Sequence, residues 1–198
     1  MEYYKFSSTQ GKLTAELSFK GISWEDKKSS NAFVTDVSVT LFENSQPSNI
    51  VWRRVFPNET TPSHPWGNCN LCVLTDNLVA SAIGNDLTLL NIKTGETICT
   101  FPLGNTPIVR LEISKAQDAL FVLSQYQGFS SDQNRSKSNL YKISFFSSGY
   151  RLDWSADLHN SQNLIKNFSI KGSILQVETK NGEVLINSNT GEVITENL

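Results

Sequence analysis

The residues best suited to chemistry in this chain are two cysteines three positions apart, preceded by a histidine. Cys69 and Cys72 form a Cys-x-x-Cys motif, and His64 stands five positions before Cys69. The pattern is typical of a redox-active thiol pair or of half a zinc site. A structural zinc site needs four ligands, usually from a second pair, whereas only the scattered Cys99 and His159 remain. A zinc site is therefore not expected.

The surroundings of the motif favour a structural role for its thiols. A reactive pair is typically placed at a helix N-terminus, which lowers the thiol pKa, but this pair leads into a predicted strand at residues 71–75. Residues three apart in an extended strand point to opposite faces of the sheet, so the two thiols would not meet. We expect no metal, no cofactor and no thiol catalysis.

Other catalytic groups find little support in the sequence. Asp153 and Asp157 lie four residues apart near Trp154, and glycoside hydrolysis needs two carboxylates about 5–10 Å apart across a cleft. The sequence does not give that distance. Neither histidine has a Ser or Cys partner in a glycine-flanked turn, as nucleophilic catalysis would require. We therefore favour a protein that is not an enzyme and leave the enzyme hypothesis open.

Candidate partner-binding residues lie in segments that we predict as loops. The candidates are Trp24, His64, Trp66, Phe129 and Arg135. Trp, Tyr and Arg dominate binding hot spots, and loops on a rigid scaffold commonly carry binding surfaces. The polar insertion at residues 127–138 is the best single contact loop, with a disordered bulge as the alternative. Loop tryptophans also commonly pack onto their own scaffold, which is the competing hypothesis.

Composition limits the class of partner and the compartment. The 198 residues are 38% hydrophobic, enough to bury a core without a metal or disulfide. The net charge is −2, and Arg53-Arg54 and Lys27-Lys28 are only pairs, so nucleic-acid binding is disfavoured. No apolar run approaches the ~20 residues of a membrane span, and the first residues lack a signal peptide. With three cysteines, we expect a cytoplasmic protein with reduced thiols.

The elements that must position all these residues are β-strands. Apolar and polar residues alternate in residues 13–19, 37–41 and 175–178, which places one face on a core and the other in water. No stretch keeps the helical spacing i, i+3, i+4, i+7 through three turns. Pairs such as Asn181-Gly182 supply the positive φ of tight hairpin turns. The sequence therefore predicts an all-β fold built of hairpins.

One phrase occurs twice in the chain. Residues 84–98 are GNDLTLLNIKTGETI and residues 181–194 are NGEVLINSNTGEVI. Each is a short apolar strand, an Asn, a Thr-Gly-Glu turn and a second apolar strand. A hairpin that recurs at this scale indicates a repeat architecture, in which one unit needs its neighbours to bury its face.

The predicted strands group in fours. They are 3–6, 13–19, 33–42 and 50–56; 71–75, 78–83, 87–92 and 97–101; 108–113, 119–125, 140–146 and 150–154; and 164–170, 174–179, 184–186 and 193–195. Equivalent positions on the fourth strands are Trp52, Cys99, Trp154 and Thr195, separated by 47, 55 and 41 residues. These separations are close to the ~40–50 residues of a four-stranded propeller blade.

We therefore predict a small β-propeller of four blades, each a four-stranded antiparallel sheet. Residues 1–198 would form one domain, with approximate blades 1–60, 68–104, 106–158 and 161–198. In a closed monomer, the strand at residues 3–6 would share a sheet with a strand of the last unit. The alternative is an incomplete ring closed by a second copy, because open sheet edges invite pairing.

The repeated phrase resembles the repeat of quinoprotein-type β-propellers. That repeat has an Ala-x-Asp before the Thr-Gly turn and a Trp four residues after the Gly; here Asn91 and Asn187 stand near the Asp position, with Cys99 and Thr195 at the Trp position. Residues 111–122 are more similar to the first two strands of a WD-type blade. The resemblance implies the architecture and does not extend to an activity. It implies that quinone-dependent dehydrogenases have a larger ring, a secretory signal and a metal site, whereas this sequence predicts four blades and no signal peptide.

The function that these observations favour is a soluble protein-binding module. Such a scaffold could act as an adaptor or as an inhibitor of a partner protein, of the immunity or antitoxin kind, and be a monomer or a homodimer. The alternative is a small-molecule or carbohydrate-binding enzyme, a hydrolase or lyase, on a propeller scaffold. A structural subunit of a larger assembly is a third hypothesis.

Overall fold

In the computed structural model the chain is built almost entirely of strands. The described residues are 2–21, 35–44, 49–57, 71–83, 85–104, 106, 108–125, 138–158, 165–179 and 182–197. Tertiary contacts divide the chain into two units, Met1–Leu111 and Glu112–Leu198. The one helical segment of the described residues is a short 3₁₀ turn, η2 (Lys115–Gln117). None of these residues forms a helix of the length and apolarity needed to cross a membrane.

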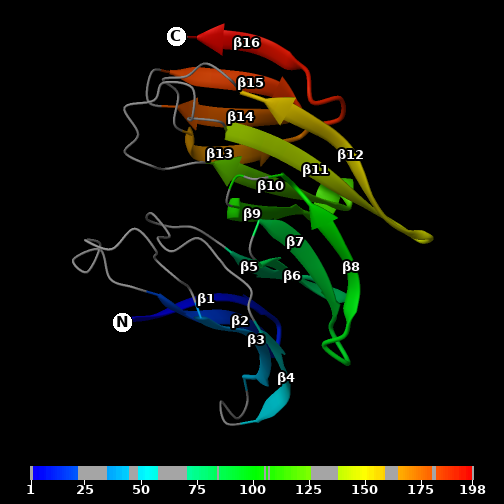
Figure 1. The fold of residues 1–198 in the computed structure, drawn as a ribbon. Helices are drawn as coiled ribbons and strands as arrows, with labels where there is room; N and C mark the ends of the chain where they lie inside the picture. The colour runs from blue at the N-terminus through cyan, green and yellow to red at the C-terminus, as the bar shows by residue number, and fades with distance from the viewer. Residues whose placement is uncertain are drawn as a thin grey trace. The chain divides into compact units, whose positions relative to one another are not determined.

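The described strands form four separate sheets, each with four strands in sequential order (Figure 1). The first contains β1 (Glu2–Gln10), β2 (Leu13–Gly21), β3 (Thr35–Glu43) and β4 (Ile50–Phe56); the second contains β5 (Cys72–Leu74), β6 (Leu78–Ile83), β7 (Asp86–Asn91) and β8 (Thr97–Pro102). The third contains β9 (Ile108–Ser114), β10 (Ala119–Gln125), β11 (Ser138–Phe146) and β12 (Gly149–Asp157); the fourth contains β13 (Ile165–Lys171), β14 (Ile174–Thr179), β15 (Glu183–Asn187) and β16 (Val193–Asn197). The predicted all-β class is confirmed.

The first strand belongs to the first sheet. It pairs with β2 over its whole length, from Glu2 opposite Gly21 to Gln10 opposite Leu13. The last strand, β16, pairs with β15 in the fourth sheet. The pairing of residues 3–6 with a strand of the last unit concerns the two separate units and stays a prediction.

Alternation along the strands separates a buried face from a polar face in the first sheet. On β2, Ala15, Leu17 and Phe19 are fully buried, and the rings of Tyr4 and Phe6 on β1 stack on Phe19 at centroid distances of 5.5 and 6.0 Å. This apolar face lies toward β5 of the second sheet, which both β1 and β2 contact. Burial of large aromatic side chains is the main stabilising term at this joint.

A β-bulge recurs at the same place on the fourth strand of every sheet. In the first sheet, Leu41 pairs with Trp52 and Phe42 with Ile50, so Val51 is the extra residue. The extra residues of the other sheets are Ile98, Asp153 and Ile194. The residue after each bulge is Trp52, Cys99, Trp154 or Thr195, which confirms that these positions are equivalent. A bulge re-aims the side chain that follows it.

The tryptophans that follow two of these bulges join neighbouring sheets within each unit. The indole Nε1 of Trp52 donates to the carbonyl of Ile92 at 2.8 Å, and that of Trp154 donates to the carbonyl of Ser188 at 3.1 Å. Both acceptors are the residue just after the Asn of the repeated phrase. The phrase is therefore the docking site for the preceding sheet.

The repeated phrase folds into the same hydrogen-bonded turn at both places. The Asn91 side chain accepts from the amides of Lys93 and Thr94 at 2.8 and 3.3 Å. Asn187 accepts from the amides of Asn189 and Thr190 at 2.9 and 3.3 Å. An Asx turn of this kind needs a side-chain oxygen and no charge, which explains why Asn serves near a position where the resembled repeat has Asp.

Candidate functional site

The five predicted partner-binding residues lie outside the described residues. They are Trp24, His64, Trp66, Phe129 and Arg135. Cys69 and His159 of the predicted thiol and metal candidates lie outside them as well. Their roles stay predictions.

Cys72, the second cysteine of the Cys-x-x-Cys motif, is a buried residue of β5. Its side chain is 1% exposed, and the Ser81 hydroxyl donates to its Sγ at 3.4 Å. Burial raises the pKa of this thiol from 9.0 to about 12, although the hydrogen bond from Ser81 opposes the shift. Because the thiolate is the reactive form, these properties favour a structural role for Cys72.

Asp153, one of the two paired aspartates, is held as an ionised group. Its carboxylate accepts hydrogen bonds from the Ser144 hydroxyl and from Arg151 Nε, the latter at 2.9 Å. Burial favours a raised pKa for Asp153, but the bonds from Ser144 and Arg151 and the charges of Arg151 and Lys142 outweigh it and hold that pKa below its usual value. A carboxyl with a lowered pKa is poorly suited to act as the general acid of a glycosidase.

The polar face of the first sheet is the most extensive arrangement of functional side chains in the first unit. Strand alternation brings one side of all four strands together on it, and we call it the first-sheet outer face. It includes Tyr3, Lys5, Glu16, Ser18, Lys20, Arg53 and Val55, with the buried side chains of Ser38 and Thr40 between them. It lies on the opposite side of the sheet from the aromatic core around Phe19.

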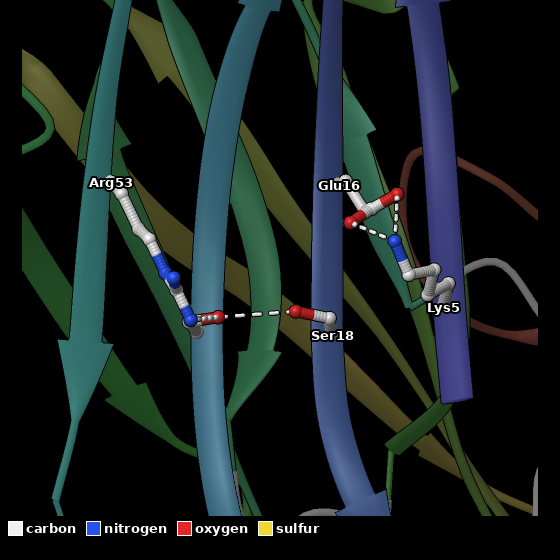
Figure 2. A network of polar contacts seen from close by, with 5 residues as sticks. Lys5, Glu16, Ser18 and Arg53 are labelled. Carbon is white, nitrogen blue, oxygen red and sulfur yellow. Dashed lines mark hydrogen bonds and ion pairs between the residues drawn. The ribbon is translucent and has the colours of Figure 1, made fainter. Parts of the chain in front are cut away.

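A line of polar contacts crosses this face (Figure 2). Lys5 Nζ lies 3.1 Å from Glu16 Oε1 across β1 and β2. Arg53 donates from Nη2 to the Ser38 hydroxyl at 3.4 Å, and Ser38 and Ser18 share a hydrogen bond of 3.0 Å. These contacts order the side chains on a flat surface without removing their charge.

The face carries more positive than negative charge. Lys5, Lys20 and Arg53 stand against the single carboxylate of Glu16, in a chain whose net charge is −2. Tyr3 is 64% exposed, and Lys20 Nζ lies 5.8 Å above its ring. An exposed Tyr beside a lysine suits contact with an acidic protein surface. Sequence reasoning missed this face, because its cations stand on three different strands and only the strand register places them on one side of the sheet.

A second candidate is a cavity of about 610 Å³ on the fourth sheet. It is lined by Asn167, Phe168, Ser169, Gln176, Glu178, Thr179, Gly182 and Glu183. Glu178 and Glu183 stand opposite each other on β14 and β15, and Lys166 Nζ lies 4.0 Å from Glu178. Oε1 of Glu183 is buried with no hydrogen-bond partner among the described residues. The cavity offers acceptors to a ligand rich in N–H or O–H donors.

Comparison with known proteins bears on the fold. No protein-family model and no curated protein matches the sequence. A solved β-propeller domain, that of Cps50 (Swd1) from Myceliophteria thermophila, is similar over 96% of this chain and 70% of that chain, with a TM-score of 0.57 and 13% identity. Its likeness, together with four four-stranded antiparallel sheets, confirms the predicted architecture. The chain has the β-propeller fold. Each sheet is one blade, and at this identity the likeness concerns the fold alone.

Proposed function

We propose that this chain is a non-enzymatic protein-binding module and that the first-sheet outer face is one of its contact surfaces. The observation that carries the proposal is the exposed Tyr3, which stands opposite Lys20 and two residues from Lys5, on a blade face that also carries Arg53 on its fourth strand. A propeller fold by itself hosts unrelated functions, so the proposal rests on this surface.

The chemistry of the face favours an acidic protein partner. The face suits a protein interface, where an aromatic anchor is surrounded by polar contacts. Lys20 is placed to meet carboxylates of the partner, which would speed association at low salt and set its orientation.

Within this class the chain acts as an adaptor or as an inhibitor. A small acidic scaffold that covers a partner with one face suits an inhibitor of the immunity or antitoxin kind, working in the cytoplasm. An adaptor would bind two partners on different faces at once. The identity and number of the captured chains distinguish these two roles.

The test is capture from a lysate of the source organism with the tagged chain and its variants. The variants are Tyr3→Ala and Lys20→Ala, with Lys93→Ala in an exposed turn of the second blade as the matched control. We expect one stoichiometric partner that Lys93→Ala retains and that the two face variants lose or weaken. Equal capture by all variants would remove this face from the interface, and capture of no chain would overturn the module hypothesis.

The cavity on the fourth blade favours a second candidate function, the binding of a small polar ligand such as a carbohydrate. Its lining combines the amides of Asn167 and Gln176 with the carboxylates of Glu178 and Glu183, groups that commonly bind sugar hydroxyls. Titration with mono- and disaccharides, followed by calorimetry, tests it. Saturable binding that Gln176→Ala abolishes supports this function, and no heat up to millimolar sugar contradicts it.

A further inference from the structure

The outer strand of the first blade, β4, presents an unpaired edge. Among the described residues β4 pairs with β3 alone. Five of its seven residues are exposed, with Ile50, Val51 and Val55 at 51%, 46% and 55%. A row of free backbone N–H and C=O groups flanked by aliphatic side chains is a template for an added strand.

Two adjacent arginines stand on this edge strand and point to opposite faces of the sheet. Arg53 is opposite Thr40, on the outer face, while Arg54 is opposite Val39, on the inner face. The guanidinium of Arg54 lies 5.6 Å from the Phe56 ring, and Arg53 has its weak bond to Ser38. The strand itself contains no acidic residue, and neither arginine has a carboxylate partner among the described residues.

The outer strands of the other three blades differ from β4 in this respect. β8 carries no charged residue and ends at Pro102, which has no N–H to donate. On β12, Arg151 is paired with Asp153 at 2.9 Å. On β16, the charged residue is acidic, Glu196. The combination of a free edge and two available cations therefore belongs to β4.

We propose that β4 accepts an extended acidic segment of the partner protein as a fifth strand of the first blade. Backbone hydrogen bonds would supply the pairing. Two consecutive acidic side chains, which an extended segment points to opposite faces, would meet Arg53 on one face and Arg54 on the other. This inference rests on the proposed function and names the conformation and charge of what the module binds.

The probe is a fluorescein-labelled peptide, Thr-Val-Thr-Glu-Glu-Thr-Val-Thr, titrated with the whole chain up to millimolar concentration by fluorescence anisotropy. We expect saturable binding that weakens when Gln-Gln replaces Glu-Glu. Arg53→Gln and Arg54→Gln should each weaken it about two- to fivefold, as for exposed ion pairs. Lys93→Gln, a cation removed elsewhere in the same unit, should leave it unchanged.

A separate experiment tests backbone pairing, because binding through charge alone would not depend on the N–H groups of the peptide. A control peptide carries N-methyl groups on every residue, so neither of its edges can donate hydrogen bonds to β4, while its charge is unchanged. It should lose binding, because methylation removes the N–H donors and blocks the close approach of the two backbones. Amide hydrogen exchange of the chain should slow at alternate residues of β4 when the unmodified peptide binds.

The results separate this inference from the proposed function. Absent binding, or unchanged binding of the methylated peptide, overturns strand addition, whatever the lysate experiment shows. If the double variant of Arg53 and Arg54 aggregates while the parent binds no peptide, the arginines protect the edge from pairing, and the inference is wrong. Peptide binding without any captured lysate partner would leave β4 as a strand acceptor and contradict the proposed function.

Discussion

The indole of Trp52 lies directly on the backbone of Gly95, forty-three positions later in the chain. A Cβ atom at Gly95 would stand 2.7 Å from Cδ2 of that indole. Trp154 and Gly191 repeat the relationship in the second unit, again at 2.7 Å. Both glycines have positive φ, 71° and 77°. The Thr-Gly-Glu turn therefore serves as a docking site for the tryptophan of the preceding blade.

Gly95→Ala should destabilise the chain by about 3 kcal/mol, because a side chain there meets the indole and sits at positive φ. The matched control is Gly172→Ala, where φ is 61° but no atom lies within 4 Å of the added Cβ. The control should cost about 1 kcal/mol from backbone strain alone. Denaturant midpoints of the two variants measure the difference. Equal losses would show that the indole does not rest on Gly95.

The two Asx turns predict a distinction between Asn91→Ala and Asn91→Asp. Alanine removes the acceptor for the amides of Lys93 and Thr94 and should cost about 1 kcal/mol. Aspartate keeps the acceptor and should cost less. Thermal melts of the variants check the order, and Asn187→Ala and Asn187→Asp should follow it. A larger loss with aspartate than with alanine would contradict the Asx turn.

The Gln125 side chain joins the third blade to the fourth by accepting a hydrogen bond from a backbone amide of the fourth blade. Its Oε1 accepts from the Ile165 amide at 2.9 Å and from the Ser138 hydroxyl at 3.0 Å, and the side chain is 1% exposed. Gln125→Leu would leave both donors buried without an acceptor and should cost about 2–3 kcal/mol. Ser138→Ala removes one donor and should cost about 1 kcal/mol. Unfolding midpoints of the two variants test this ranking. A smaller loss of stability with Gln125→Leu than with Ser138→Ala would contradict it.

The buried thiol of Cys72 predicts a loss of stability at alkaline pH. The thiol pKa is about 12 in the folded chain and 9.0 ordinarily, so above about pH 9 the thiol of the unfolded chain loses its proton first. This favours the unfolded state and lowers the free energy of unfolding as pH rises. Between pH 8 and pH 10 the parent should lose about 1 kcal/mol more than Cys72→Ala. Urea unfolding at both pH values measures this. Parallel losses in the two chains would mean that the thiol is accessible when folded.

Much of the strand pattern could be predicted from local residue order. The alternation in β2 and β14 gives the strand and its buried face directly, and the apolar runs of β6 and β10 match strands buried at every residue. β1 runs to Gln10. The predicted strand ends at residue 6, because residues 7–10 are polar and show no apolar alternation. Pairing with β2 holds them in the sheet, and that pairing leaves no periodic apolar signal in β1 itself.

The contacts between blades could not be predicted in the same way. The equivalence of Trp52 and Trp154 follows from their spacing. Their contact with the Thr-Gly-Glu turns depends on the bulges at Val51 and Asp153, and no pattern in the sequence predicts those bulges. The first-sheet outer face was missed for a similar reason. Lys5, Lys20 and Arg53 come from three strands, and only the strand register places them on one side of the sheet.

The most direct test of the central claim is the affinity of the purified partner for the chain and its face variants, measured by calorimetry at two salt concentrations. We expect one-to-one binding and a loss of more than about 1 kcal/mol with Tyr3→Ala. Binding should weaken at higher salt, and Lys20→Ala should make this salt dependence less steep. Lys93→Ala should bind as the parent does. Unchanged affinity and salt dependence in the Tyr3 and Lys20 variants would contradict the claim that the first-sheet outer face binds the partner.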